Sequence, residues 1–190
     1  MFIRTKKVKK KNKTYEYAHL VVGVWKKEQI NNTKEKRHLA PYKNARHVYC
    51  TFLGPVVRIT TVFPLEFETF FDGCFEEFVH LKTPSQIYTA LLNYVLCSHG
   101  FKPYSTFVFV HDSLFVDLNK QTVQKEGKKI VLKIQNVGGY ICALTLNQLF
   151  TLTRIATKQE GLALLKILKR MGISLTSKQF FVLVDKLLKE

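Results

Sequence analysis

The chain has 190 residues, of which 46% are hydrophobic and 23% charged, and its formal net charge is +16. This composition is typical of a folded protein and excludes a largely disordered one; the length suffices for one domain plus a small appendage. No apolar run approaches about 18 residues, so no membrane-spanning helix is expected.

The positive charge lies at the two ends of the chain. Residues 1–50 carry 14 Lys and Arg against 3 Asp and Glu, residues 51–150 carry 8 against 8, and residues 151–190 carry 8 against 3. Lysines that served only solubility would be spread more evenly, so this asymmetry favours a nucleic-acid partner. The alternative interpretation is a solvated basic face that has no partner. A membrane surface is disfavoured because the basic stretch has no amphipathic helical pattern.

The first 27 residues, MFIRTKKVKKKNKTYEYAHLVVGVWKK, are predicted to form a β-hairpin. Residues 2–8 and 14–25 have strand character, and residues 10–13 form the turn. A polar connection follows, and residues 46–53 are predicted as a third antiparallel strand that Gly54-Pro55 ends. Such a sheet would hold cations on a fixed scaffold that suits an anionic polymer. Its aromatic side chains would stack on bases or form cross-strand packing pairs.

The predicted nucleic-acid contacts are mostly the cations of this module. They are Arg4, Lys6, Lys7, Lys9, Lys10, Lys11, Lys13, Tyr15, Trp25, Lys26, Lys27, Lys34, Lys36, Arg37, Arg46 and, from the last helix, Lys178.

Residues 1–55 also resemble the opening of DDE insertion-sequence transposases. In that family a basic strand precedes a YxxLVxSxR strand, a charged loop and a strand that ends in YLG; the matching stretches here are YEYAHLVVGVW and YCTFLG. Gly23 stands where the family prefers Ser, and Phe52 stands for Tyr. The resemblance implies an amino-terminal DNA-contacting region of a mobile-element protein or of a host protein descended from one.

The middle of the chain is predicted to be α+β. The phenylalanines at 63, 67, 70, 71, 75 and 78 are interpreted as core, mostly on one helical face. A helix is expected from the capping Thr83 to Gly100. Short strands are expected on both sides of residues 111–113, with a turn at 121–127 and strands at 128–134 and 138–144.

From Thr145 the pattern becomes helical to the end of the chain. The break at residues 171–174, followed by a helix that begins at Thr-Ser, resembles a helix-turn-helix. The last helix is dominated by apolar residues, whereas a recognition helix must present polar side chains to base edges. An ordinary helical hairpin or a dimer face is therefore the alternative.

No catalytic, metal or cofactor site is predicted. Asp112 and Asp117 lack a later carboxylate with which to share a metal ion, and consecutive His111, Asp112 and Ser113 do not form a triad. The four cysteines show no CxxC spacing and are expected to be reduced and buried.

The sequence thus predicts a cytoplasmic, nucleoid-associated prokaryotic protein of the α+β class. Its expected parts are a basic antiparallel β module (1–55), a mixed α+β body (56–144) and a C-terminal helical hairpin (145–190). The expected function is non-catalytic DNA binding. RNA binding, as in a ribosome-associated protein, and an assembly protein that dimerises through its C-terminal helices are the alternatives.

Overall fold

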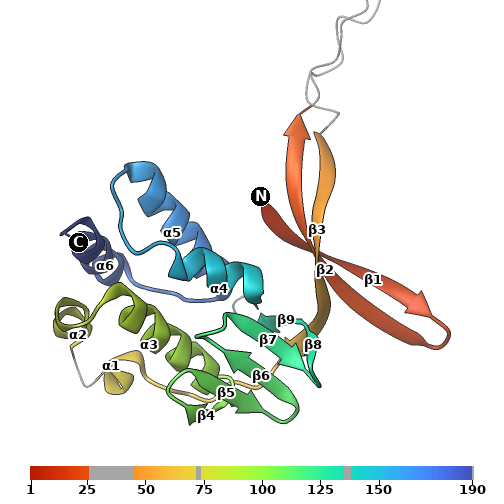
Figure 1. Ribbon diagram of the computed structural model, residues 1–190, viewed down its shortest axis with the longest axis horizontal. Helices are drawn as coiled ribbons and strands as arrows, with labels where there is room; N and C mark the ends of the chain where they lie inside the picture. Colours follow the sequence, from red (N-terminus) through yellow and green to blue (C-terminus); the bar gives the residue numbers. More distant parts are fainter. Residues whose placement is uncertain (26–44, 72–73, 135–137, 190) are drawn as a thin grey trace, which may run out of the picture.

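The computed structural model describes residues 1–25, 45–71, 74–134 and 138–189 (Figure 1). The fold is of the α+β class, as the sequence predicts, with two five-stranded sheets and two groups of helices, one before and one after the second sheet along the chain. None of the helices within these ranges is long and apolar enough to span a membrane.

The first sheet contains the amino-terminal strands in the order β1-β2-β3-β9-β10. Its strands are β1 (Phe2–Lys10), β2 (Lys13–Trp25), β3 (Ala45–Ile59), β9 (Val131–Ile134) and β10 (Gly139–Ile141). The predicted three-stranded antiparallel arrangement of β1, β2 and β3 is confirmed. The sheet then continues into the body, because β9 pairs with β3 in parallel.

Strand β3 corrects the expectation that Gly54-Pro55 ends a strand, since it continues to Ile59. Gly54 has a φ of +131°, and a Cβ there would lie 3.0 Å from the carbonyl oxygen of Lys129. The glycine therefore lets β3 pass close to β8 and turn from β2 to β9. The expected boundary between residues 55 and 56 falls inside this strand.

The second sheet is an antiparallel meander in the order β4-β5-β6-β7-β8. Its strands are β4 (Lys102–Ser105), β5 (Val108–His111), β6 (Leu114–Asp117), β7 (Thr122–Lys125) and β8 (Lys128–Lys129). The strands on both sides of residues 111–113 are confirmed. The prediction of a turn at 121–127 is wrong. Residues Thr122–Lys125 form β7, and tight turns with positive φ at Gln121 and Glu126 lie on either side of it. The strand expected at 128–134 is split into β8 and β9 around Ile130.

Six helices occur in the described ranges: α1 (Phe67–Phe70), α2 (Phe75–Leu81), α3 (Pro84–Cys97), α4 (Ala143–Phe150), α5 (Lys158–Met171) and α6 (Ser177–Lys189). Helix α3 begins as predicted: the Thr83 side chain accepts from the Gln86 backbone N–H, and the Gln86 side chain accepts from the Thr83 backbone N–H. The strand expected at 138–144 is shorter than predicted, since α4 already begins at Ala143.

The main core surrounds α3. Its buried face consists of Ile87, Tyr88, Leu91, Leu92, Val95 and Leu96. The inner side of the second sheet contributes Phe109, Leu114, Val116 and Val123 to the same cluster. The Tyr88 hydroxyl donates to the Leu152 carbonyl at 2.5 Å. Burial of each large apolar side chain in this cluster stabilises the folded state by about 1.5–3 kcal/mol. This core therefore holds the body together.

The predicted phenylalanine core is confirmed with one exception. Phe71 and Phe75 are buried, and their neighbours at 67, 70 and 78 pack against the same cluster. Phe63 is 53% exposed and is corrected to a surface position, because it lies in an extended segment before α1. The expectation of buried cysteines is confirmed for Cys142 and corrected for the other three, since Cys74 and Cys97 are half-buried and Cys50 is exposed on β3.

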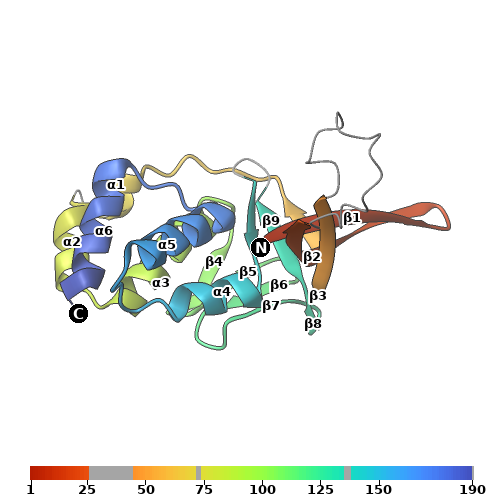
Figure 2. The ribbon, with the colours of Figure 1, turned by 90° about the horizontal axis from the view of Figure 1, so that it is seen from above.

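The C-terminal helices α5 and α6 are present as predicted, and Gly172 ends α5 with a left-handed φ of +80°. Helix α6 packs against α2, with Leu183 and Leu187 buried. The β1–β2 hairpin projects from the body on the side away from α2 and α6, and both views agree on this (Figures 1 and 2).

Candidate nucleic-acid interface

The β1–β2 hairpin keeps an uninterrupted antiparallel register from the Phe2–Val21 pair to the Lys10–Lys13 pair. Lys11 and Asn12 form its turn. Residues that oppose one another in such a ladder share a face, and successive residues alternate between faces. The register therefore assigns every side chain of the hairpin to one of two faces.

The inner face attaches the hairpin to the body. Ile3 and Ala18 are buried and form a small cluster with Val131 and Cys142, which lie on β9 and just after β10. Leu20, the cross-strand partner of Ile3, is also buried. Because the base of the hairpin is packed while its tip projects, the cations near the tip stand on a fixed support (Figure 1).

The outer face carries cations and aromatic rings. We define it by the alternating residues Arg4, Lys6, Val8 and Lys10 of β1 and Lys13, Tyr15, Tyr17 and His19 of β2. Its four Lys and Arg side chains are exposed. Lys10 and Lys13 are direct cross-strand neighbours, and like charges so placed destabilise a sheet. An anion between them would remove this repulsion.

Glu16 is the one acid among residues 1–25, and the register places it on the opposite face from Tyr15 and Tyr17. Its carboxylate accepts from Arg58 Nε at 2.7 Å, and Lys133 Nζ lies 3.9 Å away. Partial burial acts to raise the pKa of Glu16, but hydrogen bonds from Thr5 and Arg58 and the charges of Arg58 and Lys133 lower it below the ordinary value. The acid is thus neutralised within the sheet and does not offset the outer face.

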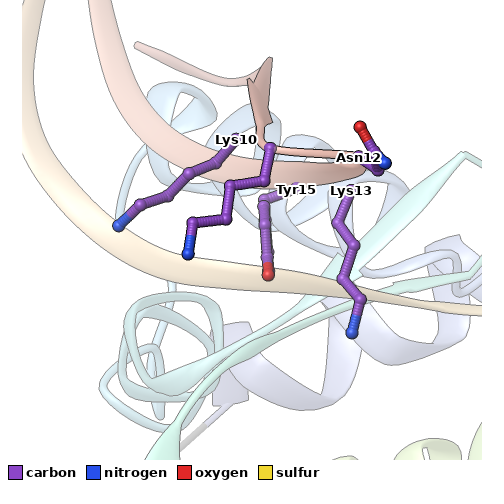
Figure 3. Close-up of a pocket in the computed structure, with 5 residues that line it drawn as sticks. Lys10, Asn12, Lys13 and Tyr15 are labelled. Carbon is purple, nitrogen blue, oxygen red and sulfur yellow. The ribbon is translucent and has the colours of Figure 1, made fainter.

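The tip of the hairpin forms a shallow, open hollow. It is lined by Lys10, Lys11, Asn12, Lys13 and Tyr15 (Figure 3). The side chains of Lys10, Lys13 and Tyr15 extend from the same side of the turn in this view, and Asn12 is directed away from them. Three ammonium groups and a phenol at one tip provide donors for phosphate oxygens.

The structure brings together some of the predicted residues and not others. Lys7 and Lys9 are exposed on the inner-face side beyond the packed base, next to the turn. The predicted contacts at Lys26, Lys27, Lys34, Lys36 and Arg37 lie outside the described residues. Trp25 and Arg46 lie in the paired ends of β2 and β3, and their side chains also fall outside the described part.

Lys178 is not part of this surface. It is the second residue of α6 and pairs with Glu76 of α2, and the hydrogen bond and charge of Glu76 raise the pKa of Lys178. The two helices lie at the end of the molecule opposite the hairpin (Figure 2).

Sequence reasoning missed two outer-face rings, His19 and Phe52. The alternation of 15, 17 and 19 along β2 was a signal for His19. Phe52 pairs with His19 only because β-bulges shift the β2–β3 register between Ala18 and His19 and between Leu20 and Val21.

Within the described ranges, no three His, Cys, Asp or Glu side chains gather as a metal site requires. Asp117 accepts from the Lys120 backbone N–H, and His111 Nδ1 lies 3.3 Å from an Asp112 carboxylate oxygen. Both acids therefore serve the turns that flank β6.

Comparison with protein-family models, with curated proteins and with solved structures finds no match for this chain. The resemblance of residues 1–55 to transposases therefore stays an expectation from the sequence.

Proposed function

We propose that the chain is a non-catalytic DNA-binding protein that holds the phosphate backbone with the cations of the β1–β2 hairpin. The observation that carries the proposal is the charge arrangement of the outer face. Arg4, Lys6, Lys10 and Lys13 are exposed there, while Glu16 faces the other way and is paired with Arg58.

The scaffold is suited to this role because the base of the hairpin is packed against the body through Ile3 and Ala18. Cations on a fixed ribbon lose less conformational freedom on binding than the same cations on a flexible tail. Contacts of this kind go to phosphates, which position a protein on nucleic acid without reading its sequence. With about six contacts, the slope of log affinity against log salt on duplex DNA is about −5.

The test compares two variants that lose the same number of charges. In the first, Lys10, Lys11 and Lys13 at the tip are all replaced by glutamine. In the control, the exposed Lys82, Lys120 and Lys158 of the body are replaced in the same way. Fluorescence anisotropy with a labelled DNA duplex at about 0.1 M salt should show a loss of tenfold or more for the tip variant and a small change for the control. If both variants lost affinity equally, binding would depend on the net charge of the protein and not on the hairpin, which would contradict the proposal.

RNA is the alternative polynucleotide, because its phosphates offer the same contacts. A competition titration of duplex DNA against structured RNA at fixed salt separates the two. Displacement of the DNA by a stoichiometric amount of RNA would favour a ribosome-associated role.

Exposed apolar side chains on α6 favour a second function, that of a dimerising assembly protein. Phe181 is 69% exposed and Leu188 51%. They lie seven residues apart and so share one helical face. A strong dimer in sedimentation velocity, together with weak binding of nucleic acid, would support this function instead.

The remaining parts of the proposal come from the sequence. We propose a prokaryotic, nucleoid-associated cytoplasmic protein whose amino-terminal region is related to those of mobile elements.

A further inference from the structure

Four aromatic rings form a line across the outer face. Tyr15 and Tyr17 are stacked, with centroids 6.5 Å apart and planes at 22°. Tyr17 lies 5.9 Å from Phe52, and Phe52 lies 5.4 Å from His19. Three of the rings come from β2 and one from β3, so the line follows the sheet from the hairpin tip toward the body.

Cross-strand packing accounts for only part of this line. It explains the half-buried Tyr17 and His19. Tyr15 keeps 42% of its surface exposed and Phe52 keeps 59%. Tyr15 is an end of the continuous aromatic row, and Phe52 lies within it between Tyr17 and His19. Two large rings that remain so open offer π-faces to a ligand.

The cations of β1 run beside the rings. In the cross-strand register Lys6 opposes Tyr17 and Arg4 opposes His19, while Lys10 and Lys13 oppose one another beyond Tyr15. Residues 1–25 and 45–59 contribute no other acid than Glu16, which faces the opposite side. A partner that suits this face combines flat rings with a regular series of negative charges.

Duplex DNA does not expose the faces of its bases, because they are stacked inside the helix. Unpaired bases do expose them, and proteins that bind single strands combine a basic track with aromatic side chains on which bases stack. An anionic membrane would satisfy the cations, but its binding uses a broad apolar surface rather than a row of rings between lysines.

We propose that the outer face binds a single-stranded polynucleotide. Its bases stack on Tyr15, Tyr17 and Phe52, and its phosphates contact Arg4, Lys6, Lys10 and Lys13. This inference rests on the proposed function and deepens it, since it names the strand state of the nucleic acid.

The first experiment measures the affinity of the full chain for a labelled oligonucleotide of about 20 nucleotides and for the duplex of the same sequence. The oligonucleotide is prepared as both DNA and RNA. The wild type should bind at least one single strand about tenfold or more tightly than the duplex. The single strand that binds more tightly, DNA or RNA, shows which sugar the protein prefers. Equal or tighter binding of the duplex would overturn the inference.

The second experiment removes the two exposed rings. Tyr15→Leu with Phe52→Leu should weaken single-strand binding by about tenfold or more and change duplex binding little, since base stacking is lost while the charges stay. Tyr104→Leu with Phe115→Leu is the matched control, because these rings are 81% and 47% exposed on the second sheet. Thermal denaturation confirms that each variant folds.

Crosslinking of the unchanged protein provides a readout that does not depend on a variant. Ultraviolet irradiation with an oligonucleotide that contains 5-iodouracil should give adducts at Tyr15, Tyr17 or Phe52. Adducts confined to other regions would overturn the inference, as would anionic phosphatidylserine vesicles that compete fully with the oligonucleotide.

The outcomes also separate the two proposals. If the tip-lysine variant loses affinity while the ring variant behaves as wild type, the phosphate-binding function stands and the single-strand inference fails. If the tip-lysine variant binds like its control, the proposed function itself fails.

Discussion

Glu16 on β2 and Arg58 on β3 form an ion pair in which the Arg58 Nη2 and Glu16 Oε2 atoms lie 2.7 Å apart. Arg58 is also the cross-strand partner of Lys133 on β9, so two cations of the sheet face one carboxylate. The pair connects the projecting hairpin to the strand that enters the body. It also removes the negative charge that would otherwise weaken anion binding.

Replacement of Glu16 by glutamine should destabilise the protein in a pH-dependent way. The pKa of Glu16 is lowered below its ordinary value of 4.5, so its stabilising effect is fully present above that value and is lost as pH falls through the lowered pKa. Because Arg58 is partly exposed and solvent screens the pair, we expect a loss of about 0.5–1 kcal/mol at pH 7. Urea denaturation at pH 7 and at pH 3 measures the difference. Glu77→Gln, at an exposed position of α2, is the control. A loss for Glu16→Gln that is as large at pH 3 as at pH 7 would contradict this account.

Gly139→Ala should destabilise the fold by about 1–3 kcal/mol or more, the range of overpacked cores. A Cβ at Gly139 would lie 2.5 Å from the Gly172 backbone nitrogen and 2.7 Å from the Met171 carbonyl carbon, so β10 or the end of α5 must shift. Gly161→Ala is the matched control, since nothing lies within 4 Å of its Cβ and the site is inside α5. That control should stabilise by about 0.5–1 kcal/mol. Thermal unfolding measures both variants. If Gly139→Ala were more stable than Gly161→Ala, the backbone around Gly139 and Gly172 would be able to move apart, which would contradict this account.

Lys178→Gln distinguishes the sequence prediction from the structure. Lys178 is paired with Glu76 far from the hairpin, so its loss should leave duplex affinity within about twofold. Lys13→Gln, which removes an exposed cation beside Lys10, should weaken binding several-fold more. Equal effects in a titration at the same salt would place α6 in the interface after all.

Much of the fold could be predicted from local patterns. The hairpin followed from cations and β-branched residues on either side of a polar turn, and α3 followed from its Thr83 cap and Pro84. Strand β7 was missed because QTVQKEG buries a single strand residue, Val123, and is otherwise polar. The passage of β3 through Gly54 to its parallel partner β9 could not be predicted, because that pairing depends on residues more than 70 positions apart.

The candidate site was predictable in its charges and less so in its rings. Each lysine of residues 4–13 was visible as a cation, and alternation alone decides which of them share a face. The place of Phe52 depends on two register shifts between β2 and β3. A single-residue slip moves a side chain to the opposite face, so the aromatic row became visible only with the structure.

The most direct test of the central claim is the salt dependence of duplex binding by the wild type and by the variant in which Lys10, Lys11 and Lys13 are replaced by glutamine. If these side chains neutralise phosphates, the log–log slope should change from about −5 toward about −2, since each lost contact removes roughly 0.9 from its magnitude. The Lys82, Lys120 and Lys158 control should keep the wild-type slope. A tip variant with the slope and affinity of the wild type would show that the hairpin does not hold the phosphate chain.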